Sequence, residues 1–166
     1  MKLKIADERG FTLIEVIVTL ILVGITAAMA GMWIVSVASG YVFAKKNMET
    51  TQKAQLTLTR LEKEFKSINA ITASSASGIT YNRLNNSGAP VTDQTVARNL
   101  SLLKLNNDTL TNSVSAFTLS YCDDVTSTSC HSAWSPTSRI ILITLTLTGA
   151  DNVQSTFTQR VAPRNL

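Results

Sequence analysis

Residues 10–44 have the sequence GFTLIEVIVTLILVGITAAMAGMWIVSVASGYVFA, and this stretch decides the fold. Glu15 is its only charged residue, so the 29 residues from 16 to 44 carry no charge. A helix needs about 20 apolar residues to cross the core of a bilayer. The stretch is therefore predicted to form a transmembrane helix that also projects beyond the membrane.

A short polar segment, residues 1–10, precedes the apolar stretch. It holds three Lys or Arg residues against two acidic residues. Surplus positive charge favours the cytoplasmic side, but Lys45 and Lys46 at the other end of the stretch favour the opposite orientation. Charge alone leaves the orientation open.

An ordinary secretory signal peptide is one alternative, because Ala28-Met29-Ala30 is an A-x-A cleavage pattern after an apolar run. Two features weaken it. The apolar run continues past Ala30 as far as Val37, and Glu15 has no use in an export signal. A secreted protein cut after Ala30 is the weaker interpretation.

Gly10, Phe11 and Glu15 are followed at once by a long uncharged segment. Residues 10–15, with the sequence GFTLIE, closely resemble the cleavage and methylation motif of the type IV prepilin family. This family includes type IV pilins and type II secretion pseudopilins. The resemblance implies that prepilin peptidase cuts between Gly10 and Phe11. It also implies that the new amino group of Phe11 is N-methylated.

Glu15 has a physical interpretation beside this resemblance. A carboxylate inside a membrane helix costs roughly 2.5 to 3.5 kcal/mol on insertion scales, so it normally has a partner or a function. At headgroup depth the cost would be small and no partner would be needed. The resemblance implies that Glu15 pairs with the Phe11 amine of a neighbouring subunit during assembly. Thr12 is a second assembly candidate, although a helical Thr more often bonds its own backbone.

From Lys45 onward the pattern becomes amphipathic. Apolar residues recur at spacings of four, three, four and three, at Ala54, Leu58, Leu61, Phe65 and Ile68. This stripe predicts an amphipathic helix over residues 45–72 that docks on a sheet. A coiled coil is the alternative, but the pattern is too short to favour it.

Residues 73–166 change to β-type alternation. The strongest predicted strand, residues 139–148, has Ile or Leu at 141, 143, 145 and 147 and Thr at 144, 146 and 148. Further strands are expected at residues 79–84, 100–105, 109–110, 116–122 and 153–162, and a loop at residues 85–94. The predicted fold is α+β and pilin-like. A long N-terminal helix, transmembrane over residues 11–44, packs through its amphipathic half on an antiparallel sheet.

Two cysteines, Cys122 and Cys130, lie eight positions apart in a Ser/Thr-rich stretch. A short-loop disulfide suits an oxidising compartment. Two partly buried free thiols are the alternative. A CxxC or multi-ligand zinc pattern is absent from the sequence.

The sequence holds no catalytic constellation. His131 is the single histidine, and it follows Cys130 directly; adjacent residues on one strand would point to opposite faces, and a disulfide would consume the thiol. Asp123 and Asp124 offer oxygens to Ca²⁺, but two carboxylates without further ligands more often form a solvated loop. The Lys and Arg residues are scattered, and the net charge is only +4. We expect no enzyme activity, no cofactor, no resident metal and no nucleic-acid partner.

A looser resemblance extends along the chain. Residues 61–65, the strand with Tyr121, Trp134 and the ending at residues 157–165 are similar to J-type pseudopilins of type II secretion and related minor pilins. This similarity favours a minor, tip-located or priming subunit over a major one. An adhesin or DNA-binding tip module on a membrane tether, with residues 122–136 as its contact surface, is the alternative from a different class.

The family resemblance also implies where the protein acts. The precursor would be a single-pass protein of the inner membrane, with the leader, residues 1–10, in the cytoplasm and the domain of residues 73–166 in the periplasm. It would then enter a type IV pilus or a type II pseudopilus. The implied partners are prepilin peptidase, other pilins or pseudopilins, an inner-membrane assembly platform and the lipid bilayer.

Overall fold

The chain divides into two compact units, residues 1–42 and residues 43–166. The computed structural model describes residues 10–85, 87–126 and 129–166, so the predicted leader lies outside the described residues except for Gly10. The elements in chain order are α1 (Leu13–Lys66), β1 (Ile68–Ser74), β2 (Gly78–Leu84), β3 (Pro90–Asn99), β4 (Leu102–Leu105), β5 (Asp108–Thr111), β6 (Val114–Cys122), β7 (Cys130–His131), β8 (Ile140–Thr148), η1 (Ala150–Asn152) and β9 (Gln154–Val161).

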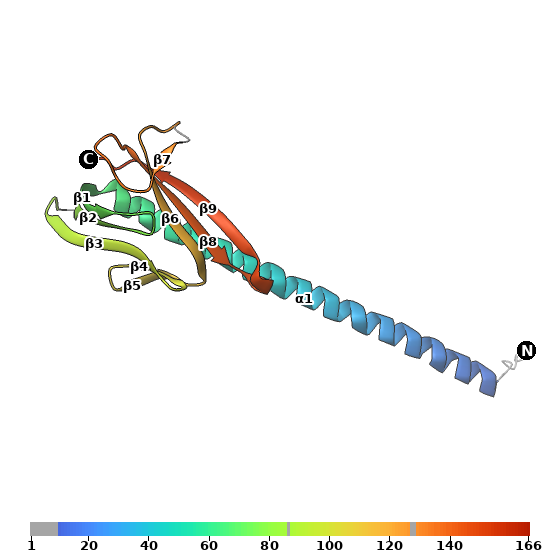
Figure 1. Cartoon of the computed structure of the whole chain (residues 1–166). Helices are drawn as coiled ribbons and strands as arrows, with labels where there is room; N and C mark the ends of the chain where they lie inside the picture. The colour runs from blue at the N-terminus through green and yellow to red at the C-terminus, as the bar shows by residue number, and fades with distance from the viewer. Residues whose placement is uncertain (1–9, 86, 127–128) are drawn as a thin grey trace, which may run out of the picture. The chain divides into compact units, whose positions relative to one another are not determined.

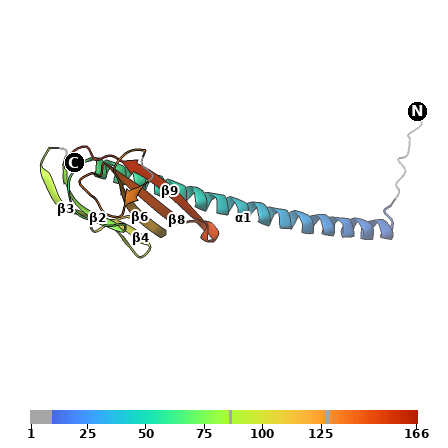
Figure 2. The same cartoon turned by 45° about the horizontal axis from the view of Figure 1, so that its top comes forward.

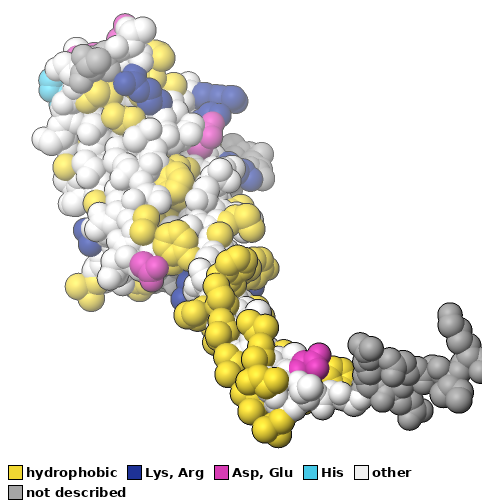
Figure 3. Space-filling view, turned by 90° about the vertical axis from the view of Figure 1, so that its right-hand side faces the viewer, with side chains coloured by type: hydrophobic (Ala, Val, Ile, Leu, Met, Phe, Trp, Pro, Cys, Tyr) yellow, Lys and Arg dark blue, Asp and Glu magenta, His cyan; other side chains and the backbone are white. Residues whose placement is uncertain are grey.

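The first unit is the N-terminal part of α1. It stays helical through Gly24, Gly31 and Gly40, because no proline interrupts it and each glycine costs only about 1 kcal/mol of helix propensity. All residues from 10 to 42 are exposed. Figure 3 shows hydrophobic side chains covering this part of the helix. By length and composition, α1 is able to cross a membrane.

The second part of α1, residues 43–66, belongs to the second unit and packs on its sheets. Figures 1 and 2 show the strands of both sheets on one side of this part of the helix. Four residues of the predicted stripe are buried there, namely Ala54, Leu58, Leu61 and Phe65. The predicted packing of an amphipathic helix on antiparallel strands is confirmed.

The helix ends earlier than predicted. α1 stops at Lys66, and β1 occupies much of the segment that was expected to be helical up to residue 72. Ile68 is fully buried as predicted, but it lies in β1. Ile68 follows Phe65 by three residues, a spacing that fits the buried stripe of a helix. The same residue also fits an inward-facing position on a strand. Antiparallel pairing of β1 with β2, which places Ile68 opposite Arg83, decides for the strand.

The antiparallel strands form two sheets, with orders β1-β2-β3-β4-β5 and β7-β6-β8-β9. β6 connects them through backbone hydrogen bonds. The N–H of Leu119 donates to the carbonyl of Ala76 at 2.8 Å, and the N–H of Val114 donates to the carbonyl of Ser101 at 2.9 Å. Both sheets and α1 therefore enclose one hydrophobic core.

Strand β3 begins inside the segment that was expected to be a loop, residues 85–94. Pro90 occupies the first position of the strand, where proline is tolerated. Asp93 has a φ of 55° and lies where the pairing between β2 and β3 shifts register. Pro and Asp disfavour strands on their own, but pairing with β2 outweighs their local preference. The loop prediction was therefore wrong for residues 90–94, whereas residues 85 and 87–89 lie outside the strands.

Strand β8 has the predicted alternation. Its four inward residues, Ile141, Ile143, Leu145 and Leu147, are fully buried. On the opposite face the hydroxyl oxygen of Thr146 lies 3.0 Å from that of Thr156 on β9. The sheet β7-β6-β8-β9 thus presents an apolar face to the core and a hydroxyl-rich face away from it.

Gly149, directly after β8, allows a test of the contact between this end of the strand and Asn47 on α1. A Cβ at this position would clash with Asn47 Oδ1, which accepts a hydrogen bond from the Ala150 N–H at 3.1 Å. Gly149→Ala is expected to displace Asn47 and lower the free energy of unfolding by about 1 kcal/mol, since a partly buried donor loses its partner. Denaturant unfolding of the full chain in detergent, followed by Trp134 fluorescence in a Trp33→Phe background, measures the loss.

The matched control is Gly149→Ala in an Asn47→Ala background, where the hydrogen bond is already absent. The loss there should be much smaller. Equal losses in both backgrounds would contradict the role assigned to the Asn47 contact.

Candidate processing and assembly site

Helix α1 begins immediately after the predicted cleavage point, with Thr12 as its N-terminal cap. The Thr12 hydroxyl oxygen accepts a hydrogen bond from the Glu15 N–H at 3.4 Å, and the Thr12 carbonyl accepts from the Val16 N–H at 3.2 Å. Threonine at the cap with glutamate three residues later is the capping-box pattern. Helix capping therefore gives Thr12 a role within the chain, and Glu15 occupies the position where the capping-box pattern has glutamate. Both are separate from any role in assembly.

Gly10 and Phe11 precede the helix and are exposed, Phe11 by 80%. A Cβ added at Gly10 would meet no other atom within 4 Å. The fold of the chain does not require glycine at this position. A requirement for glycine there would have to come from an enzyme that binds the Gly10–Phe11 bond.

Glu15 is the only acidic residue between residues 10 and 48, and it lies exposed on an otherwise uncharged helix surface. Within the described residues it forms no ion pair. The next cationic residue toward the C-terminus, Lys45, follows 30 positions later in the sequence. Within its own unit, the described residues therefore offer Glu15 no positive side chain.

The N-terminal sequence matches a known family model. Residues 5–31 match the prokaryotic N-terminal methylation motif, and the matched segment includes Gly10, Phe11, Thr12 and Glu15. The motif indicates a type IV pilin-like protein. It implies processing by prepilin peptidase and assembly with other pilins, and together with the apolar helix it fits a membrane-anchored pilin. No curated protein and no solved structure matches the chain.

The chain contains the predicted disulfide between Cys122 and Cys130, with their Cα atoms 4.3 Å apart. The two residues are paired directly across β6 and β7. The alternative of free thiols is wrong, since both cysteines are bonded. Because β7 has only two residues, the disulfide provides its covalent attachment to the sheet.

The two carboxylates that follow Cys122 accept hydrogen bonds from their own loop region. Asp123 accepts from the Thr137 hydroxyl at 3.0 Å. Asp124 accepts from the Thr126 hydroxyl at 2.9 Å and from the Val125 N–H at 2.5 Å. These hydrogen bonds, with that of Thr126 the strongest, lower the pKa of Asp124. The described residues contain no group of three or more His, Cys, Asp or Glu able to hold a metal ion.

The alternative of a binding module would place Trp134 at a contact surface, but this residue packs against the core. Its ring lies edge-on to that of Tyr121, with centroids 6.0 Å apart, and its backbone N–H donates to the Ser74 hydroxyl at 2.8 Å. Trp134 is therefore half-buried and holds the segment after β7 against β1 and β6. The sequence pattern did not reveal this, because a single tryptophan in a polar segment has no periodic neighbours.

Removing the disulfide should destabilise the second unit. Cys122→Ala together with Cys130→Ala is expected to lower the free energy of unfolding by about 2 to 3 kcal/mol, the chain-entropy value for so short a closed loop. Denaturant unfolding followed by Trp134 fluorescence measures this. Ser132→Ala, an exposed change next to β7, is the matched control and should have little effect.

Reduction of the unmutated protein should cause a similar loss, which separates the cross-link from the change in side-chain volume. If neither reduction nor substitution lowers stability, β7 is held by its other contacts and the disulfide has no stabilising role.

Proposed function

We propose that this chain is a minor pilin-like structural subunit that assembles through α1 into a type IV pilus or a type II secretion pseudopilus, at the tip or in priming. The observation that carries the proposal is the combination of the methylation motif with the exposed, uncharged helix surface directly after it. A surface of this size is too apolar to remain in water and needs lipid or other helices to cover it.

The proposal gives the precursor a membrane topology. The precursor spans the inner membrane once, with residues 1–10 in the cytoplasm and the β-sheet domain in the periplasm. Cleavage by prepilin peptidase releases the Phe11 amine, which is then methylated and keeps its positive charge. Subunits leave the bilayer with the help of an inner-membrane platform, and contacts with neighbouring helices replace contacts with lipid.

Glu15 and the apolar surface have different parts in this assembly. Apolar contacts supply attraction but little directional preference. A charge pair removed from water is favourable only in close geometry. Pairing of Glu15 with the Phe11 amine of a neighbouring subunit would therefore fix the register in which the new subunit docks.

The minor, tip-located role is supported by the looser sequence similarity to J-type pseudopilins and minor pilins. A structural rather than enzymatic role is supported by the disulfide, which occupies the Cys130 thiol beside His131. A binding tip built on residues 122–136 has less support, because Trp134 packs against Tyr121.

The N-terminus of the mature protein tests the processing step. Intact mass and N-terminal sequencing of protein from the membranes of its own host should show a chain that starts at methylated Phe11. Gly10→Val should stay uncut, and because the chain has free space at Gly10, the variant should still fold. A mature chain that starts at Gly31 would instead support the secreted alternative.

Glu15→Gln tests the assembly step. Glutamine preserves both the size of the side chain and the capping-box pattern but removes the charge. The variant should be cleaved normally, and its share in sheared filaments relative to the membrane pool should fall by about tenfold or more, the loss expected for one buried charge pair.

The control for that experiment is Thr19→Ala, which changes an exposed hydroxyl one turn further along the same helix. It should assemble normally. Normal assembly of Glu15→Gln would show that helix capping alone explains the glutamate.

A further inference from the structure

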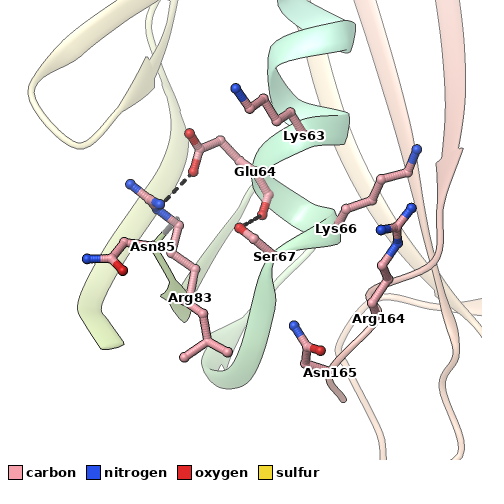
Figure 4. Close-up of a pocket in the computed structure, with 9 residues that line it drawn as sticks. Lys63, Glu64, Lys66, Ser67, Arg83, Asn85, Arg164 and Asn165 are labelled. Carbon is pink, nitrogen blue, oxygen red and sulfur yellow. Dashed lines mark hydrogen bonds and ion pairs between the residues drawn. The ribbon is translucent and has the colours of Figure 1, made fainter. Parts of the chain in front are cut away.

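A groove of about 500 Å³ lies in the second unit where α1 ends. The last turn of the helix, the end of β2 and the C-terminal tail line it, as Figure 4 shows. Four of its lining residues are Lys or Arg, and Glu64 is the one acidic residue among them. The charges of this groove are therefore unbalanced unless some of the cations are paired within the chain.

Glu64 is paired within the fold. Its carboxylate is buried and forms ion pairs with Arg60 at 3.2 Å and with Arg83 at 3.0 Å. Its backbone carbonyl accepts a hydrogen bond from the Ser67 hydroxyl at 2.7 Å (Figure 4). The only carboxylate of the groove is thus neutralised by two guanidinium groups.

Two further acceptors at the groove, the Asn85 side-chain oxygen and the Lys66 carbonyl, are also occupied. Asn85 Oδ1 accepts hydrogen bonds from the Ser87 N–H at 2.9 Å, the Ser87 hydroxyl at 2.7 Å and the Ala89 N–H at 2.8 Å. The Lys66 carbonyl accepts from the Arg164 N–H at 3.3 Å. The Asn85 side-chain NH₂ has no partner among the described residues, so this amide offers the groove a donor.

Two cations remain available. Lys63 on α1 and Arg164 on the tail are exposed, and neither side chain forms an ion pair or a hydrogen bond within the described residues. Lys66, by contrast, is paired with Glu62 at 2.5 Å. The groove therefore has a surplus of positive charge and donors, which an acceptor-rich anionic ligand would balance.

We propose that this groove binds an acidic segment of another protein, whose carboxylates pair with Lys63 and Arg164. The volume of about 500 Å³ is within the range of ligand pockets and accommodates several side chains rather than one small ion. The planar Arg164 guanidinium can bind a carboxylate through two hydrogen bonds. This interaction is distinct from assembly through α1 and does not depend on it.

A nucleic acid fits the groove less well. Proteins bind single strands by stacking bases on aromatic side chains, and no aromatic residue lines this groove. Duplex binding needs a row of phosphate contacts, whereas only two unpaired cations lie here. The observations therefore favour carboxylates presented by a peptide.

Fluorescence anisotropy of a labelled oligoglutamate peptide tests the proposal, with the full processed chain purified in a neutral detergent. Lys63→Glu with Arg164→Glu should weaken binding by about tenfold or more, as for contacts between charges that are close in space. Lys63→Gln with Arg164→Gln should weaken it by a smaller factor. Added salt should weaken binding to the unmutated protein, because the contacts are solvent-exposed charge pairs.

The matched control is Lys45→Glu with Lys104→Glu, which changes the net charge equally at residues outside the groove. Its binding should stay within about twofold of the unmutated protein. Equal weakening by both charge reversals, or binding unaffected by the groove variants, would overturn the proposal. Tighter binding of an oligothymidylate through the same two residues would overturn it in favour of a nucleic-acid site.

Discussion

The exposed apolar surface of α1 is the constraint on which the rest of the structure depends. From residue 13 to residue 42 every side chain is exposed, and Glu15 is the only charged one. Inside lipid each backbone N–H and C=O must be bonded within the segment itself, and an unbroken helix meets this condition. The described part of the first unit, residues 10–42, has no buried residue, so lipid or other helices would have to supply the apolar contacts that a core provides.

The second part of α1, residues 43–66, differs from the first because it packs on the sheets. There only one stripe is buried, and the helix must end where the sheet begins. Ser67 and the tail residue Arg164 both donate to carbonyls of the last turn, at Glu64 and Lys66. These donors satisfy groups that a helix end would leave without partners. The C-terminal tail and the helix end thus stabilise each other, and the cationic groove lies at their junction.

Features that depend on one segment could be predicted from the sequence. The motif around Phe11 is a contiguous string, and the buried stripe up to Phe65 and the alternation in β8 each repeat at a single period, so no knowledge of a partner strand was needed. The end of α1 and the start of β3 depend on β2, to which both β1 and β3 are paired. The ion pair of Glu64 with Arg83 could not be predicted either, since Arg83 lies on β2 and reaches the helix only through the tertiary fold.

Glu15 meets two requirements that arise at different stages of the proposed processing. In the precursor it stands three residues after Thr12, whose hydroxyl accepts a hydrogen bond from the Glu15 N–H, and its negative charge suits the positive end of the helix dipole. Cleavage before Phe11 would add a positive amine at that same end, which the dipole disfavours. A carboxylate in the first turn then offsets both the dipole and the amine. A residue that only capped the helix would not need its charge, since glutamine caps as well. The helix dipole thus gives one reason for the charge at this position, and under the proposed processing the amine would give a second.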